Sequence, residues 1–433
     1  MKTLRLPSAL ALLLIPALVH AADFEGYGTS IFRLEQKAAP GFDKKTIIPF
    51  TQFAGADLDQ IADGNLSLHL YGWERVDLGD RSTSEKNSDG DLSYGFLAYR
   101  FPKANAEVKG GRFFVNQGVA SEQLDGVGAR TDLAGGFGVS AFGGAPVKLD
   151  RGSNTKGDFI AGGRGSYRYG NLLEVGFSGL HETGGIFDPT TGVKRDRELI
   201  GGDLWCGPSR FVEVNGHTYY DMSREGVAEH SYQLLLRPFK TIGVSGLYNQ
   251  ADLVHFYAGS NLRSLFNPDQ GGMVRSYGGT VTWYAAAPLE LNADYRHIHR
   301  SDNFETELNG GSDRFGAEAR ITALDKKLRS GVSYHRVSGA TGFNSYHEGR
   351  GYVMYDSGRY IGSLDAIGQI YQTRIYNSKN AFELIASTGM RIMPQLTLSG
   401  ELSYGQNPRL ADDLKGLVRL TFNYVAQGKG AKK

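Results

Sequence analysis

The sequence predicts a single antiparallel transmembrane β-barrel of about 22 strands, within a range of roughly 18 to 24. Three observations predict it: an N-terminal secretion signal, alternation of apolar and polar residues along the rest of the chain, and alternation of tight turns with long loops. The composition agrees, with 59 Gly, 23 Tyr and 23 Phe beside one Cys and a mean hydropathy of −0.32. Half of every barrel strand is polar, which keeps hydropathy modest. A secreted β-rich protein could share this composition, so the pattern of residues along the chain is needed to distinguish it from a barrel.

Residues 1–22 have the features of a secretory signal. Lys2 and Arg5 precede an apolar stretch from Ala9 to Val19, and the small residues Ala21 and Ala22 suit cleavage. No cysteine follows to carry a lipid anchor, and no later segment reaches the roughly 18 apolar residues that a spanning helix needs. We therefore predict an exported protein without helical membrane spans.

Charge and cysteine content exclude several classes of function. Removing the signal takes two of the 47 basic residues and none of the 46 acidic ones, which leaves a formal charge of −1. That balance excludes a bulk basic surface for nucleic acid and carries no prediction about ion selectivity. Cys206 is the single cysteine, so no intrachain disulfide can form, and its simplest role is a small apolar strand residue.

The alternation is clearest in the last predicted hairpin, 396–405 and 416–426. On its return arm Val418, Leu420, Phe422 and Tyr424 share one face, because successive side chains of a strand point to opposite faces. A soluble sandwich would bury such a face as its core. The apolar faces here end in tyrosine, as in the aromatic girdles of membrane interfaces, and the pattern recurs behind a secretion signal. We therefore interpret the apolar face as facing lipid.

The same pattern, divided by turn residues, places the strands along the mature chain with bounds good to a few residues. The predicted strands are 23–35, 46–60, 64–79, 91–101, 106–116, 125–134, 136–147, 158–169, 172–182, 197–206, 211–221, 227–237, 241–251, 274–286, 289–300, 313–323, 328–338, 346–356, 359–372, 381–393, 396–405 and 416–426. The predicted organisation is thus a signal at 1–22, one barrel at 23–426, and a basic tail at 427–433 that we expect to be disordered in the periplasm.

The connections alternate in length. Even-numbered strands end in tight turns such as Gly135-Gly136 and Gly170-Asn171, whereas odd-numbered strands lead mostly into longer polar loops such as 80–90, 148–157 and 183–196. Short turns on one side and long loops on the other are typical of outer-membrane barrels, at their periplasmic and extracellular ends respectively. The phase of the alternation points Arg112 at lipid, so we expect a bulge or a shifted strand boundary there.

If apolar residues face lipid, the polar face of the cleaner strands lines the lumen. The predicted lumen residues are Glu174, Ser178, Glu213, Asn215, His217, Asn292, Asp294, Arg296, Glu318, Arg320, Glu401 and Arg419. Their mixed charge suits a wet channel. They are either solvated side chains that balance one another or part of a specific ligand site, and the sequence favours the first.

No catalytic or metal site is predicted. His297 and His299 share a strand face and could hold a metal, but near the outer rim they fit interfacial side chains better; Asp57 and Asp59 could bind calcium but more simply face water. No Gly-rich phosphate loop and no nucleophile elbow occurs in a suitable context. We predict no enzymatic activity.

The first predicted strand begins so early that we expect no plug domain before it. A lumen of about 22 strands is wider than that of a diffusion porin and needs an occupant. The candidates are infolded loops, notably 253–273, or a separate protein.

Three stretches carry a family resemblance: Asp63 to Trp73, Gly111 to Gly118, and Asp313 to Gly316. With them the chain resembles the porin-like barrels of metal-reducing bacteria, in which the barrel sheathes a multihaem cytochrome across the outer membrane. The resemblance implies multihaem c-type cytochromes as partners on the periplasmic and outer surfaces, beside outer-membrane lipid and the barrel assembly machinery. Haem would belong to those partners, because one cysteine cannot supply a CxxCH attachment motif.

Two functions follow, both in the outer membrane of a Gram-negative bacterium. One is the insulating sleeve of a trans-membrane electron conduit, which the resemblance favours. The other is a diffusion porin for small solutes or ions, constricted by its own loops.

Overall fold

The computed structural model describes residues 23–38, 45–61, 64–80, 87–147, 157–187, 194–252, 272–302, 310–376, 378–408 and 410–426. The predicted signal at 1–22, the predicted tail at 427–433 and most of the predicted infolded loop at 253–273 lie outside these residues.

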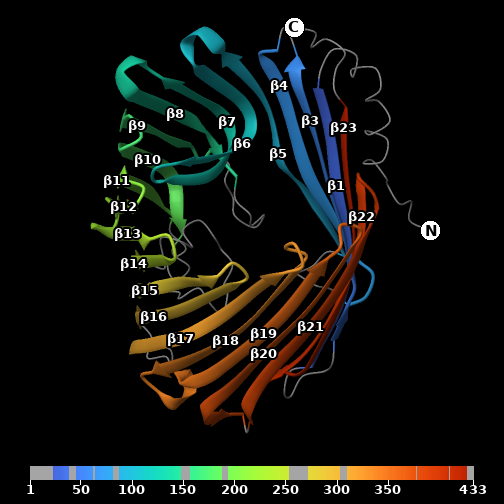
Figure 1. The fold of residues 1–433 in the computed structure, drawn as a ribbon. Coiled ribbons are helices and arrows are strands. Elements are labelled where there is room, and N and C mark those ends of the chain that lie inside the picture. Colours follow the sequence, from blue (N-terminus) through green and yellow to red (C-terminus); the bar gives the residue numbers. More distant parts are fainter. Residues whose placement is uncertain are drawn as a thin grey trace, which may run out of the picture.

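The chain closes into a barrel through its first and last strands (Figure 1). β1 (Asp23–Ala38) pairs antiparallel with β3 (Pro49–Ile61) on one side and with β23 (Leu410–Ala426) on the other. The short β2 (Lys45–Ile47) pairs with the far end of β1 and lies in line with β3, so the two occupy one position in the wall. The result is a closed antiparallel barrel of 22 strands, which confirms the predicted fold class and strand number.

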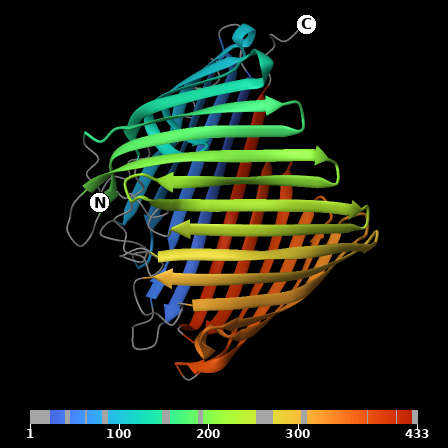
Figure 2. The same cartoon turned by 90° about the vertical axis from the view of Figure 1, so that its left-hand side faces the viewer.

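The strands follow one another around the wall in chain order (Figure 2). Between β3 and β23 they are β4 (Leu66–Asp77), β5 (Ser88–Phe101), β6 (Ala106–Gln117), β7 (Ala120–Asp132), β8 (Phe137–Pro146), β9 (Ile160–Tyr169), β10 (Leu173–Phe187), β11 (Lys194–Ser209), β12 (Val212–Asp221), β13 (Gly226–Phe239), β14 (Ile242–Asp252), β15 (Gly272–Ala286), β16 (Leu289–Asp302), β17 (Gly310–Ala323), β18 (Leu328–Gly339), β19 (Tyr346–Asp356), β20 (Tyr360–Ile375), β21 (Ser378–Met393) and β22 (Leu396–Asn407).

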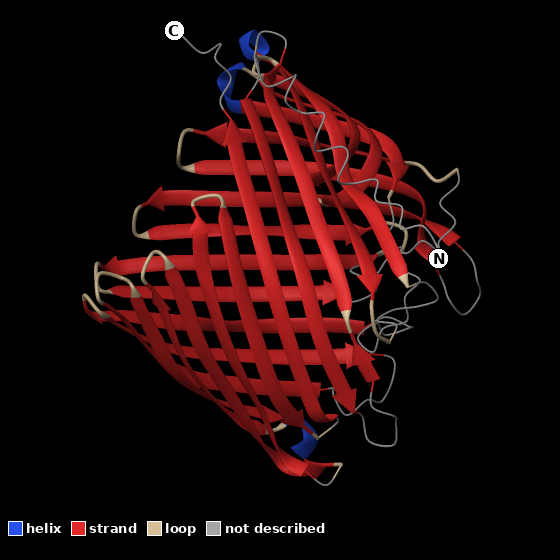
Figure 3. Ribbon diagram, turned by 90° about the vertical axis from the view of Figure 1, so that its right-hand side faces the viewer, coloured by secondary structure: helices blue, strands red, loops and turns tan. Residues whose placement is uncertain are grey.

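Helix is confined in the described part of the chain to single 3₁₀ turns: η2 (Pro102–Ala104), η3 (Ala134–Gly136) and η4 (Gly342–Asn344) (Figure 3). None of the described helices is long and apolar enough to cross a bilayer. The turn at η3 depends on glycine, because Gly135 and Gly136 have φ values of +82° and +90°, which a side chain disfavours. This is one of the tight turns that the sequence predicts.

One predicted loop is wrong. Residues 117–124 were expected to connect two strands, yet β6 runs to Gln117 and β7 begins at Ala120, so only Gly118 and Val119 form the turn. Several other strands also run past their predicted ends, for example β10 to Phe187 and β22 to Asn407.

The register defines the two faces of the wall, because side chains of directly paired residues point to the same side. The face carrying Leu398, Val418 and Leu420 is the outer one, and large apolar side chains are exposed on it all around the barrel; Phe177 is 75% exposed and Val332 64%. Soluble monomers rarely expose apolar surface on this scale. An outer surface of this kind fits lipid rather than water.

This assignment of faces predicts opposite outcomes for neighbouring residues of β20. Leu364 lies on the outer face, whereas Ser363 lies on the inner face and contacts Ser387 (Oγ to Oγ 2.6 Å). Leu364→Arg should destabilise the folded barrel in lipid vesicles by at most about 2 to 4 kcal/mol, because the cost of a cation on the lipid face is largest at the bilayer midplane and falls toward the interfaces. Ser363→Arg is the control and should change the free energy of unfolding much less. Denaturant titration in vesicles measures both; equal effects would contradict the assignment of faces.

Candidate functional site

One hairpin leaves the wall and enters the lumen. The pairing of β5 with β6 stops at Gly95 and Arg112, and the pairing of β7 with β8 begins only at Leu124 and Pro146. β6 and β7 nevertheless remain paired with each other as far as Gln117 and Ala120. Residues 113–123 therefore form a two-stranded ribbon without neighbours in the wall, and Figure 1 shows β6 and β7 curving inward. We call this segment the inner hairpin.

Glycines permit the bend at its base. Gly111 has a φ of +127°, and a Cβ there would lie 2.3 Å from the carbonyl oxygen of Gly95. A Cβ on Gly126, the partner of Gly111 in β7, would lie 2.2 Å from the carbonyl oxygen of Gly143. Only residues without a side chain allow such close strand contacts.

Arg112 lies on the outward-pointing register next to this bend. Its guanidinium donates to both carboxylate oxygens of Asp125 (2.8 and 2.9 Å) and to the carbonyl oxygen of Leu92 (2.9 Å). The left-handed φ is at Gly111, and the nearest irregularity of a ladder is in the pairing of β4 with β5. The irregularity expected at Arg112 is thus the point where β6 leaves β5, with the charge neutralised by Asp125.

An apolar cluster holds the inner hairpin against the wall. Leu124 at the base of the hairpin, Ile160 of β9 and Leu199 of β11 are at most 1% exposed. The other members share this burial and come from the hairpin and the adjoining wall: Phe113, Val115, Val119, Ala120, Phe142, Leu180 and Ala228. Full burial stabilises each large apolar side chain by about 1.5 to 3 kcal/mol. The hairpin is therefore docked by a small hydrophobic core of its own.

Polar contacts fix the tip. The backbone N–H of Val119 donates to Ser178 Oγ on β10 (3.0 Å), and Tyr219 Oη on β12 donates to the carbonyl oxygen of Gly118 (2.7 Å). Gly118 has a φ of +56°, and a Cβ there would lie 2.1 Å from Ser178 Oγ. The turn thus needs glycine both for its conformation and for its closeness to the wall.

A buried ion triad completes the anchor. Arg197 of β11 bridges Glu122 of the hairpin (2.5 Å) and Glu182 of β10 (2.7 Å). Arg197 and Glu182 are 5% and 3% exposed. Such a group adds little net stability, but removing one partner leaves buried charge uncompensated. The triad therefore specifies where the hairpin docks.

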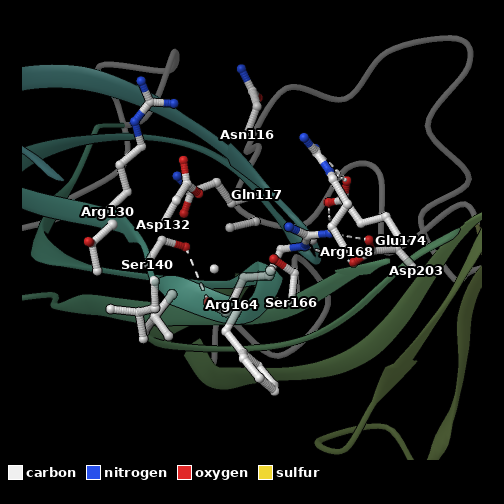
Figure 4. Close-up of a pocket in the computed structure, with 18 of the residues that line it drawn as sticks. Asn116, Gln117, Arg130, Asp132, Ser140, Arg164, Ser166, Arg168, Glu174 and Asp203 are labelled. Carbon is white, nitrogen blue, oxygen red and sulfur yellow. Dashed lines mark hydrogen bonds and ion pairs between the residues drawn. The ribbon is translucent and has the colours of Figure 1, made fainter. Parts of the chain in front are cut away.

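A cavity of about 810 Å³ lies between the tip of the inner hairpin and the wall formed by β7 to β12 (Figure 4). Its polar lining residues include Asn116, Gln117, Ser121, Arg130, Asp132, Ser140, Arg164, Ser166, Arg168, Glu174, Asp203 and Tyr219. Neither hairpin nor wall encloses this space alone.

Ion pairs order one side of the cavity. Arg164 contacts Asp203 through two nitrogens (2.5 and 3.0 Å) and Glu174 through Nη2 (3.1 Å), and Glu174 in turn accepts from Arg168 (2.6 Å). The side chains of Arg168 and Arg130 remain 67% and 64% exposed. The charged lining residues are three arginines and three carboxylates, so the cavity is polar and formally neutral.

The structure places every predicted lumen residue on the inner face, opposite the exposed apolar side chains. Glu174 lines the cavity, and Ser178 contacts the tip of the inner hairpin. A second group gathers on β16 to β18, where Asp294 contacts Arg314 (3.0 Å) and His335 (2.9 Å). Whether these residues contact a solute stays a prediction.

The remaining predicted residues make local contacts on the inner wall. Glu213 accepts from Trp205 Nε1 (3.1 Å), His217 lies 3.3 Å from Glu229, and Arg296 donates to Ser276 (2.9 Å). Asn292 donates to Glu290 (2.9 Å) and Arg320 donates to Glu318 (2.7 Å), each within its own strand. In the ladders Asn215 lies opposite Trp205, Glu401 opposite Leu417 and Arg419 opposite Ser399.

The two candidate metal sites lie on opposite faces of the barrel wall. His297 is on the outer face and contacts Asp313 (2.8 Å), whereas Asp57 is on the inner face and contacts His69 (2.7 Å). Within the part of the chain that the structure describes, no group of three or more His, Cys, Asp or Glu side chains could hold a metal ion.

Sequence reasoning missed the inner hairpin. A signal was present, because Phe113, Val115 and Leu124 occupy positions of the inner face, where neighbouring strands carry polar residues. Apolar residues on the polar face mean that something covers them.

Comparison with known proteins places the fold. No family model matches the chain, and no curated protein matches its sequence. A variant of the ferric enterobactin receptor PfeA from Pseudomonas aeruginosa superimposes with a TM-score of 0.58 and 10% identity, over 93% of this chain and 81% of that one. The siderophore receptor PirA from the same organism gives 0.56 and 12%, over 93% and 80%. OccAB4 of Acinetobacter baumannii superimposes over 95% of this chain and 100% of that one, with 8% identity. Its TM-score of 0.47 is too low to support an argument.

These similarities define a class. The chain is a closed 22-stranded β-barrel that resembles barrels of the bacterial outer membrane. Because only about a tenth of the residues are identical, the likeness concerns the fold alone.

The ion triad predicts how firmly the inner hairpin is held. Arg197→Gln removes the cation between two carboxylates, and breaking a buried pair of this kind costs about 3 to 5 kcal/mol. We expect loss of hairpin docking, seen as cleavage by thermolysin, which cuts before apolar residues, within residues 113–123 of the folded protein. Arg224→Gln, which breaks the more exposed pair with Asp252 (2.8 Å), is the control. Equal resistance of both variants would contradict the anchoring role.

Proposed function

We propose that the protein is a solute channel of the outer membrane of a Gram-negative bacterium, constricted by its own inner hairpin. The observation that carries this proposal is a built-in obstruction on a polar inner wall. A hairpin with its own apolar core and ion triad occupies the lumen at the level of Ser178 and Tyr219. An obstruction made from the wall itself narrows a pore without closing it to small polar solutes.

The membrane placement is supported by the outer surface. Apolar side chains are exposed on the outward register of strands all around the barrel, and the pairing of β1 with β23 closes the sheet, as a sheet in lipid requires. Folding would depend on outer-membrane lipid and the barrel assembly machinery. The charges of the inner wall occur mainly as ion pairs, which favours passive passage over catalysis, and we propose neither enzymatic activity nor a cofactor of its own for this chain.

The second candidate is the sleeve of an electron conduit. Its support is the family resemblance and the width that 22 strands give. The inner hairpin weighs against it, because a cytochrome in the lumen would need the space that residues 113–123 occupy. Haem would in that case be supplied only by multihaem c-type cytochromes on the periplasmic and outer surfaces.

Shortening the inner hairpin tests the channel. Replacing residues 114–123 by Asn-Gly, a favourable two-residue turn, removes the obstruction and keeps the wall. In planar bilayers the intact protein should give small, stable single-channel steps, and the shortened variant a severalfold larger conductance because the lumen of a barrel this size is wide.

The same recordings decide between the candidates. Equal conductance of both proteins would overturn the proposed constriction. Large ohmic steps of the intact protein that multihaem cytochromes abolish, when added to both sides, would favour the sleeve instead.

The neutral cavity predicts weak ion selectivity, which a single charge should shift. Arg168 is the most exposed cation of the ion-paired cluster, at 67% of its side chain. Arg168→Glu should move the reversal potential in a KCl gradient toward that of a cation-selective pore, because the local potential of a narrow pore follows its wall charge. Arg168→Gln should give about half that shift. An unchanged reversal potential would mean that ions do not pass the cavity.

A further inference from the structure

A continuous strip of aromatic rings lines the inner wall beside the hairpin. The strip consists of Tyr27 on β1, Phe53 on β3, Tyr71 on β4, and Tyr94 and Phe96 on β5. The register places all five on the inner face, and all are partly exposed. These strands form the blue part of the wall in Figure 1.

Neighbouring rings of the strip stack on one another. Tyr71 is central, with ring centroids 5.9 Å from Tyr27, 6.3 Å from Phe53 and 5.4 Å from Tyr94, at interplanar angles of 27°, 15° and 20°. Phe96 continues the series at 5.9 Å from Tyr94. The near-parallel offset geometry is a favourable one for aromatic pairs.

A glycine lets the first ring lie flat. A Cβ on Gly55 would lie 2.4 to 2.8 Å from three atoms of the Tyr27 side chain, so that ring lies directly over the Gly55 backbone. Tyr27 thereby reaches across β3 and its hydroxyl meets the hydroxyl of Tyr94 (2.6 Å). The Tyr27 ring therefore lies along the wall rather than projecting away from it.

The strip leads to the inner hairpin. Phe96 contacts Phe113 at the hairpin base, with ring centroids 6.3 Å apart. Three strand spacings separate β1 from β5, so the strip extends over about 14 Å of wall. Elsewhere on the described inner wall, ring contacts join two residues only, as in His217–Tyr219 and Tyr346–Tyr371.

Hydrogen-bonding groups border the rings. The ring of His69 stacks on that of Phe96, with centroids 4.8 Å apart. Its Nδ1 is hydrogen-bonded to Asp57 (2.7 Å) and its Nε2 to Ser67 (2.9 Å). Asp59 is a further carboxylate on this side, with its side chain 54% exposed. Flat rings with polar groups at their margin suit a ligand with apolar faces and hydroxyl edges, and the carboxylates disfavour an anionic one.

We propose that this aromatic strip is a binding track for uncharged oligosaccharides that pass through the lumen. A pyranose ring has C–H groups on its faces and hydroxyls around its edge, which matches tyrosine faces bordered by Asp57, His69 and Ser67. The track is longer than one ring, so several sugar units bind at once and move from ring to ring toward the inner hairpin. This inference rests on the proposed channel function, because the ligand must enter the lumen.

Current block by a named sugar tests the track. Maltohexaose added to the purified full-length protein in planar bilayers should interrupt the current reversibly. Tyr71→Ala removes the ring that contacts three others, and should raise the half-blocking concentration about tenfold, since ring contacts of this kind contribute roughly one tenfold factor in affinity. Gly55→Ala should act in the same direction by displacing Tyr27.

Matched variants keep the result interpretable. Tyr352 is an inner-wall tyrosine on β19 that likewise lies over a glycine, Gly331, outside the strip. Tyr352→Ala should leave the block unchanged. If Tyr71→Ala does not fold, as judged by heat-modified gel mobility, Phe53→Ala removes a terminal ring instead. The anion 4-hydroxybenzoate should not block; block by it and not by maltohexaose would overturn the proposal.

Calorimetry separates this inference from the channel itself. Titration of maltohexaose into detergent-solubilised protein should give binding heat, and Tyr71→Ala should weaken the affinity about tenfold. An open channel with neither block nor binding overturns the track and leaves the channel. Binding that depends on Tyr71 in a protein that does not conduct supports the track and overturns the channel.

Discussion

The pairing of β1 with β23 is the interaction on which the rest of the structure depends. In hydrocarbon no water satisfies an unpaired N–H or C=O, so a sheet can span a membrane only when it has no edge. The ladder from Phe24–Ala426 to Ala38–Asp412 removes that edge. Once the wall is closed, alternation sorts the side chains, with apolar residues toward lipid and polar residues toward the lumen.

Closure also explains the cost of the inner hairpin. When β6 leaves β5 beyond Arg112, part of the wall gives up its ladder. The structure compensates with an apolar cluster around Leu124, with hydrogen bonds at Gly118 and Val119, and with the triad at Arg197. The lumen thus contains a small folded unit with an apolar interior, like the core of a soluble protein.

The two inner surfaces differ in chemistry. The wall of β7 to β12 is ion-paired and neutral around the cavity, whereas the wall of β1 to β5 carries overlapping rings. The inner hairpin lies between them and contacts both, through Val119 and through Phe113. In the proposed channel, a solute that passes the hairpin would meet a polar side and an aromatic side.

The sequence by itself determined the barrel, the number of strands and the direction of most side chains, because a period of two and the turn residues are local properties. It also placed Glu174, Asp294 and Arg320 on the inner face from their strand phase alone. The inner hairpin and the aromatic strip were decided by tertiary structure. Residues 113–123 alternate like a wall strand but place Phe113 and Val115 on the polar face, and their inward turn depends on contact with Leu180 and Leu199, far along the chain. Tyr27 and Tyr94 lie on strands separated by β3 and β4, so their meeting depends on register and on Gly55 between them, which no local pattern reports.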